Sequence, residues 1–149
     1  MKVDLTWRGE QIKARLDAAI RDGIDTTTAQ CDANSKQLTN RSNGSGRTYR
    51  KGASRATYQA SAPGEPPAKP TGLLQGSITS RPATRVGNRW VGEWGVGAGR
   101  NAGGLGYAFW LEIGTAKMAA RPYLRPSAEQ EYPKLAGRIK RLFDKGGVP

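Results

Sequence analysis

Four prolines fall within the eight residues from Pro63 to Pro70. Proline fixes φ and lacks the amide hydrogen that a helix or an inner strand requires, so this segment favours an extended backbone. It closes a stretch, residues 36–70, that is rich in Ser, Asn, Gly and Arg and has no apolar period. A stretch of this length without periodicity is either disordered or functional. We therefore expect an arm over residues 36–70 that becomes ordered only on binding a partner.

The part before the arm, residues 1–35, has the pattern of an amphipathic helix. Ile12, Leu16, Ile20 and Ile24 recur every four residues, which places them along one face. The run Thr26–Thr28 weakens this helix because β-branched side chains lose rotamer freedom there. The pattern predicts a helix from about residue 6 to the mid-30s.

The part after the arm, residues 71–149, begins with a predicted β-hairpin. Apolar and other residues alternate over 89–97, and a second strand is expected over 78–86. Gly87–Asn88 suits the connection because both residues tolerate positive φ.

Two helices are expected beyond the hairpin. Residues 107–113 suit a short buried helix, which Gly114 would end in a left-handed cap. Ser127 and Gln130 suggest a capping box for a last helix that runs to about Lys145. The expected fold is therefore α+β, one domain over residues 1–149. A small antiparallel sheet would be flanked by a long N-terminal and a C-terminal helix, with the basic arm between them.

The charge is strongly positive and unevenly spread. The chain of 149 residues has a formal net charge of +12. Residues 1–35 sum to −1, residues 36–70 to +6 and residues 71–149 to +7. A positive surface favours an acidic partner, either nucleic acid or an acidic protein surface. The alternative is that the high charge only keeps the protein in solution.

The arm interleaves basic and aromatic residues that could contact a partner. Such side chains hold phosphates and stack on bases, and they are equally favoured at protein interfaces. A solvated loop is the third reading of the same residues. The candidates are Arg47, Tyr49, Arg50, Lys51, Arg55 and Tyr58.

The composition argues against catalysis, and no catalytic residue, cofactor or metal is expected. The chain has no His, and Cys31 is its one cysteine, so neither a Cys/His dyad nor a Cys/His zinc site can form within it. Residues 97–102 match the dinucleotide pattern G-x-G-x-x-A only loosely, since more glycines follow instead of a helix. No apolar run of 18 residues and no signal-peptide pattern is visible, so we expect no membrane span.

The stretch from Gly106 to Pro126 holds the carboxylate of greatest interest, Glu112. It lies among apolar residues, and a buried carboxylate needs a partner. We expect an ion pair that fixes the turn or joins two subunits, so that Glu112→Ala would impair assembly more than folding. The basic candidates are Lys117, Arg121 and Arg125.

Two sets of residues together resemble a known family. The first is Ala62–Pro67 with Thr71–Leu74 and Ser77–Ile78. The second, which is the more specific, is Tyr107-Ala108, Leu111-Glu112, Gly114-Thr115, Lys117-Met118, Ala120–Leu124 and Pro126. With the two terminal helices they cover most of residues 8–145 and resemble the neck or tail-completion family of tailed phages, the gene product 10-like tail components. Tyr123 stands where that family often has Phe, and Ser127 where it often has Ala.

The resemblance implies a small, non-enzymatic virion protein of siphophages and related phages, assembled in the bacterial host cytoplasm. Such a subunit forms a homo-oligomeric ring, expected to be hexameric, at the head–tail junction. It would contact head-closure or connector proteins and tail-terminator or tail-tube proteins, and would surround the DNA without reading its sequence. The implied core-turn and subunit-contact residues are Tyr107, Glu112, Thr115, Lys117 and Arg121. The alternative is a free basic nucleic-acid-binding module.

Overall fold

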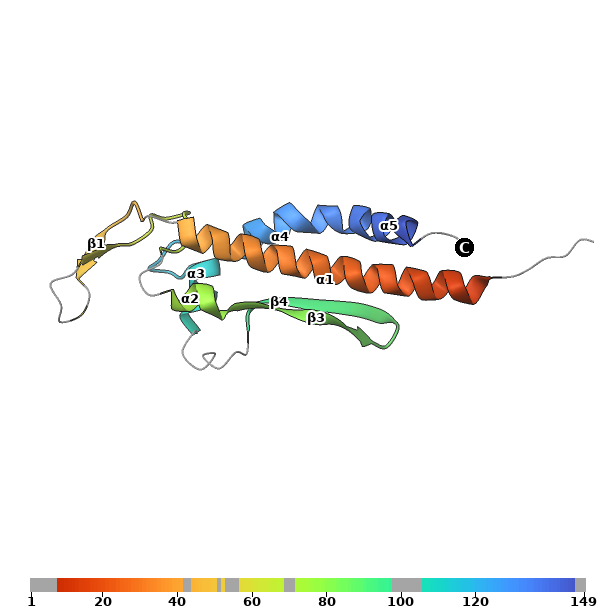
Figure 1. The fold of residues 1–149 in the computed structure, drawn as a ribbon. Helices are drawn as coiled ribbons and strands as arrows, with labels where there is room; N and C mark the ends of the chain where they lie inside the picture. The colour runs from red at the N-terminus through yellow and green to blue at the C-terminus, as the bar shows by residue number, and fades with distance from the viewer. Residues whose placement is uncertain are drawn as a thin grey trace, which may run out of the picture.

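The computed structural model describes residues 8–41, 44–50, 52, 57–68, 72–97 and 106–146. The fold is α+β, as the sequence predicts, and is elongated along one long helix, α1 (Gly9–Arg41) (Figure 1). The hairpin of β3 (Ile78–Val86) and β4 (Arg89–Val96) lies on one side of α1, and the C-terminal helices lie on the other. A second, smaller hairpin projects beyond the C-terminal end of α1.

Helix α1 continues past the predicted end at residue 35 to Arg41. Its C-terminal half buries small residues at four-residue spacing, namely Thr27, Cys31, Ser35 and Thr39. The Thr27 hydroxyl donates to the Gly23 carbonyl at 2.8 Å, and that of Thr39 donates to the Ser35 carbonyl at 3.2 Å. Because the preceding turn satisfies these hydroxyls, polar residues can continue the buried face of the helix.

The predicted apolar stripe of α1 is exposed at its first two members and only partly buried at Ile20 and Ile24. The side chains of Ile12 and Leu16 are 51% and 43% exposed. Farther along, Ile24 packs so closely on β4 that a Cβ built at Gly92 would lie 2.3 Å from its Cγ2. The close contact of α1 with the sheet therefore requires glycine at this position of β4.

Strands β3 and β4 pair antiparallel, from Ile78 opposite Val96 to Val86 opposite Arg89. Of the predicted turn residues, Gly87 takes positive φ (60°) and Asn88 does not. The register shifts between Arg81 and Thr84, around Pro82, which has no amide hydrogen for the ladder. The Asp25 carboxylate of α1 accepts a hydrogen bond from the Ala83 amide at this irregularity.

The predicted last helix is divided into α4 (Arg125–Glu131), a 3₁₀ turn η2 (Tyr132–Lys134) and α5 (Leu135–Lys145). Pro133 lies in η2, where it cannot supply a helical amide hydrogen. The buried Glu131 accepts hydrogen bonds from Asn34 at 3.0 Å, from Lys134 at 2.7 Å and from Arg138. Burial alone would raise its pKa, but these donors lower it to about 2.

A small apolar core joins the short helices α2 (Leu73–Ser77) and α3 (Gly106–Ile113) to the start of β3 and to the segment before α4. Its buried members are Leu74, Ile78, Ala108 and Tyr123. The Tyr123 hydroxyl donates to the Ala108 carbonyl at 3.3 Å. This contact fixes the segment before α4 against α3.

The second hairpin pairs β1 (Thr48–Arg50) with β2 (Thr57–Gln59). Part of the predicted arm therefore has a defined conformation in the isolated chain. The expectation that the arm is ordered only by a partner is wrong for residues 44–50 and 57–68.

Candidate functional site

The Glu112 carboxylate, at the end of α3, accepts three backbone hydrogen bonds from the start of α4. Its Oε2 accepts from the amides of Tyr123 at 2.9 Å and Leu124 at 3.0 Å, and its Oε1 accepts from Arg125 at 2.8 Å. The first amides of a helix have no partner within the helix, and a carboxylate also favours the positive end of its dipole. Glu112 therefore caps α4 from another helix.

This arrangement corrects two sequence-based expectations. Glu112 has no ion pair with Lys117, Arg121 or Arg125 in the part of the chain that the structure describes; Arg125 pairs with Glu129 instead, at 3.0 Å. Ser127 is not a cap but lies inside α4, where it accepts a hydrogen bond from Ser35 at 2.9 Å. A cap supplied 11–13 residues upstream makes the local capping box unnecessary.

The turn between α3 and α4 is closed by its own backbone. Gly114 takes φ of 80°, as predicted for a left-handed cap. The amide of Thr115 donates to the carbonyl of Met118 at 2.7 Å, and the reverse bond is 3.2 Å. Thr115 Oγ1 accepts from the amide of Lys117, whose side chain is exposed. Thr115 thus shapes the turn, and Lys117 presents a positive charge at its tip.

Arg121 is attached to this unit through its backbone, because its amide donates to the Leu111 carbonyl at 2.7 Å. Its guanidinium is partly buried and donates to the Met118 sulfur at 3.7 Å. The Nε atom is buried and has no hydrogen-bond partner among the described residues. An unpaired buried donor is costly, because no acceptor replaces the water that it loses on folding.

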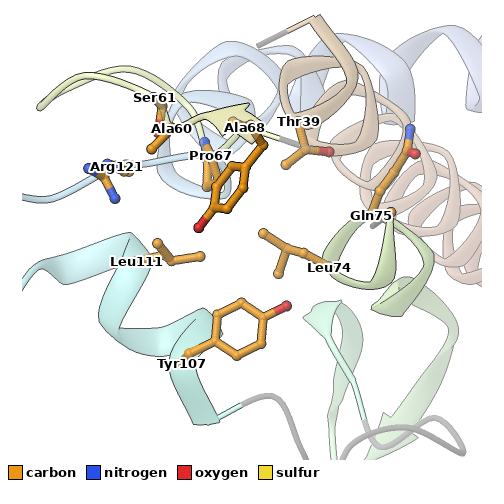
Figure 2. Close-up of a pocket in the computed structure, with 12 residues that line it drawn as sticks. Thr39, Ala60, Ser61, Pro67, Ala68, Leu74, Gln75, Tyr107, Leu111 and Arg121 are labelled. Carbon is orange, nitrogen blue, oxygen red and sulfur yellow. The ribbon is translucent and has the colours of Figure 1, made fainter. Parts of the chain in front are cut away.

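A cavity of about 230 Å³ lies beside Arg121, between the C-terminal end of α1, α2, α3 and the base of the small hairpin (Figure 2). Tyr107, predicted as a contact residue, lines it with Leu111 and Leu74. Tyr58 of β2 lines the same cavity, so the structure brings an arm residue next to the turn residues. Sequence spacing gave no signal for this meeting, because residues 58 and 107 belong to different parts of the chain.

The outer side of α3 is apolar and open. Phe109 and Trp110 are 60% and 49% exposed, and Ile113 and Tyr107 are also exposed. The two rings of Phe109 and Trp110 pack edge to face, with centroids 5.1 Å apart. Grouped exposed aromatics of this kind mark interaction surfaces.

The small hairpin exposes part of the predicted basic and aromatic set. Tyr49 and Tyr58 stack across the two strands, with centroids 5.7 Å apart and an interplanar angle of 26°. Arg47 and Arg50 are exposed beside them. Lys51 and Arg55 lie outside the described residues.

The two ends of the hairpin segment are tied together by Glu65, and the neighbouring Gly64 joins it to the body. The Glu65 carboxylate accepts from the Ser45 hydroxyl at 2.5 Å and from the Ala62 amide at 2.8 Å, and these bonds lower its pKa. The Gly64 amide donates to the Ala120 carbonyl at 3.0 Å. The hairpin is thereby held next to the turn at residues 114–118.

The described ranges offer no sign of other site types. They contain no group of three or more His, Cys, Asp or Glu side chains placed to hold a metal ion. None of the helices in those ranges combines the length and the apolar character needed to cross a membrane. Cys31 is buried, and burial raises the pKa of its thiol to about 11.

Comparison with known proteins returned no matching family model, no matching curated protein and no matching solved structure.

Proposed function

We propose that this chain is a structural subunit of the head–tail junction of a tailed phage. In this role it forms a homo-oligomeric ring, six-fold by our expectation, that joins the head-closure complex to the tail and surrounds the DNA passage. The partners would be head-closure or connector proteins and tail-terminator or tail-tube proteins. The site of action would be the virion, and no catalysis is involved.

The proposal rests on the family resemblance, and one structural observation supports it. The residues of the more specific signature form a single fixed unit: Glu112 caps α4, Gly114 supplies the left-handed turn and Tyr123 fills the core. That unit holds an apolar helix, α3, with its aromatic side chains facing outward. A rigid turn that displays Phe109 and Trp110 suits a repeated protein–protein contact better than a reaction.

Electron microscopy of virions or isolated necks that carry this chain tests the role directly. We expect a ring of density at the junction between head and tail. Copies of α1, with the β3–β4 hairpin on one side and the C-terminal helices on the other, should fit into this ring. Necks assembled without density for this chain would overturn the proposal.

A pair of variants tests the contact surface. Trp110→Ser should reduce ring formation, measured by native mass spectrometry, while leaving the free energy of unfolding almost unchanged. Val86→Ser is the matched control, because Val86 is also apolar and 52% exposed but lies at the far end of the β3–β4 hairpin. Equal ring yields from the two variants would exclude the outer face of α3 as the contact.

The alternative is a free nucleic-acid-binding module, and the stacked Tyr49–Tyr58 pair between exposed arginines favours it. A binding platform of this kind predicts tight DNA binding by the isolated chain that falls steeply with salt. Fluorescence anisotropy with a labelled oligonucleotide measures this. Weak binding at about 0.15 M salt favours the neck role, whereas strong binding there favours the module.

A further inference from the structure

The cavity beside Arg121 combines apolar walls with one cationic group that has no carboxylate partner among the described residues. Its lining includes residues from five segments, among them Thr39, Tyr58, Pro67, Leu74, Tyr107 and Leu111. Arg121 lines the same cavity, and its guanidinium is only partly buried, although the Nε atom itself is enclosed and has no partner among the described residues. The cavity therefore offers burial for an apolar group next to a positive charge that a carboxylate can approach.

The acidic groups in the described part of the chain do not pair with Arg121. Of the twelve Asp and Glu residues, eleven lie in the described ranges, and none of these is paired with Arg121. Ten of the eleven already accept a hydrogen bond or an ion pair elsewhere, namely Asp17, Asp22, Asp25, Asp32, Glu65, Glu93, Glu112, Glu129, Glu131 and Asp144. The remaining one, Glu10, lies in the first turn of α1, about 40 Å along that helix from Thr39 at the cavity.

The size of the cavity restricts what can enter it. About 230 Å³ is below the roughly 300–1,000 Å³ of sites that take cofactors or drug-sized ligands. It is large enough for one aromatic or large aliphatic side chain, the kind of anchor that dominates protein interfaces. A carboxylate next to such an anchor can reach a guanidinium and form a charge-assisted pair.

We propose that this cavity is a docking site for an acidic partner protein, which inserts one large apolar side chain and places an adjacent Asp or Glu carboxylate on Arg121. Arg121 is the charged residue among those described that line the cavity, so an acidic partner complements it. The site does not depend on the neck role, since its recognition chemistry is contained in the isolated chain.

The test uses the full chain and three short capped peptides, which carry Phe-Glu, Phe-Gln or Ala-Glu between glycines. Binding is followed by NMR through the methyl signals of Leu74 and Leu111. One anchored side chain corresponds to dissociation constants in about the millimolar range, so each peptide is titrated to about 20 mM. We expect the Phe-Glu peptide to shift both methyls and to bind about tenfold more tightly than either of the others.

Arg121→Gln separates recognition from folding. It should remove the preference for Phe-Glu over Phe-Gln and leave the weaker Phe-Gln binding unchanged, with the same circular dichroism spectrum as the native chain. Lys117→Gln is the matched control, since it removes one exposed positive charge from the same turn without lining the cavity. It should retain the preference.

Three results would overturn the proposal. The first is that the Leu74 and Leu111 methyls do not respond to the Phe-Glu peptide. The second is equal binding of Phe-Glu and Phe-Gln by the native chain. The third is a shift of the Leu74 and Leu111 methyl signals when the protein concentration is raised without any peptide. That result would assign the cavity to a second copy of this chain.

Discussion

Removal of the Glu112 carboxylate should destabilise the fold by several kcal/mol. Glu112→Ala leaves the amides of Tyr123, Leu124 and Arg125 without their acceptor. Water can replace it at Arg125, where the bond is exposed, but the other two amides are partly buried and each costs about 1–3 kcal/mol when unpaired. Taking these two near the lower end gives a loss of about 2–4 kcal/mol in the free energy of unfolding, a large part of the about 5–15 kcal/mol typical of a domain.

Urea unfolding followed by tryptophan fluorescence measures this loss. Glu129→Ala is the control: it removes an exposed carboxylate from α4 that pairs with Arg125 across one turn, worth about 0.3–0.5 kcal/mol. Glu112→Gln keeps one acceptor oxygen and should fall between the two. The same loss for Glu112→Ala and Glu129→Ala would refute the capping role. A large loss would reverse the expectation from the sequence, in which assembly was to suffer more than folding.

Three further predictions concern the interior. Glu131 has a pKa of about 2 in the folded chain against 4.5 as a free group. It therefore stabilises the fold fully above pH 4.5, and this effect is lost as the pH falls through 2. The melting temperature should fall across that window, and it should fall less for Glu131→Gln. Cys31 should react with a thiol reagent at pH 8 only after unfolding in urea, because its thiol is buried with a pKa of about 11, and rapid labelling of the native chain would contradict this. Gly92→Ala should lower the free energy of unfolding by about 1–3 kcal/mol, because the added Cβ would clash with Ile24. Gly137→Ala, in open space on α5, should raise it by about 0.5–1 kcal/mol. Similar urea midpoints for the two variants would count against the packing described.

The sequence predicted those elements whose signals are local. The alternation over residues 89–97 and the Gly87 turn gave the hairpin, and Gly114 gave the end of α3. Pro133, between two helical stretches, was a local signal that the prediction of one continuous last helix overlooked. The length of α1 was underestimated because residues 36–41 were assigned to the polar arm, whereas Thr39 is stabilised by burial and by hydroxyl bonds to the preceding turn.

The candidate site was less accessible to sequence reasoning. The stretch from Gly106 to Pro126 was recognised as a unit, and Glu112 as a carboxylate in need of a partner, but the partner was expected to be a basic side chain. Every residue except proline has a backbone amide hydrogen, so no pattern in the sequence shows which amides will donate to Glu112. The cavity at Arg121 was missed for a similar reason, since it depends on Tyr58 and Leu74 meeting Leu111 across the fold.

The central position of α1 also has a consequence for synthesis of the chain. At about 5–20 residues per second, the ribosome completes residues 9–41 roughly 5–20 s before residue 145, so α1 emerges well before β3, β4, α4 and α5, which it contacts. During that interval its later half exposes Thr27, Cys31, Ser35 and Thr39 instead of a continuous band of large aliphatic side chains. This half presents little apolar surface to other chains, so any aggregation of the waiting helix should start from the stripe of Ile12, Leu16, Ile20 and Ile24 in its first half.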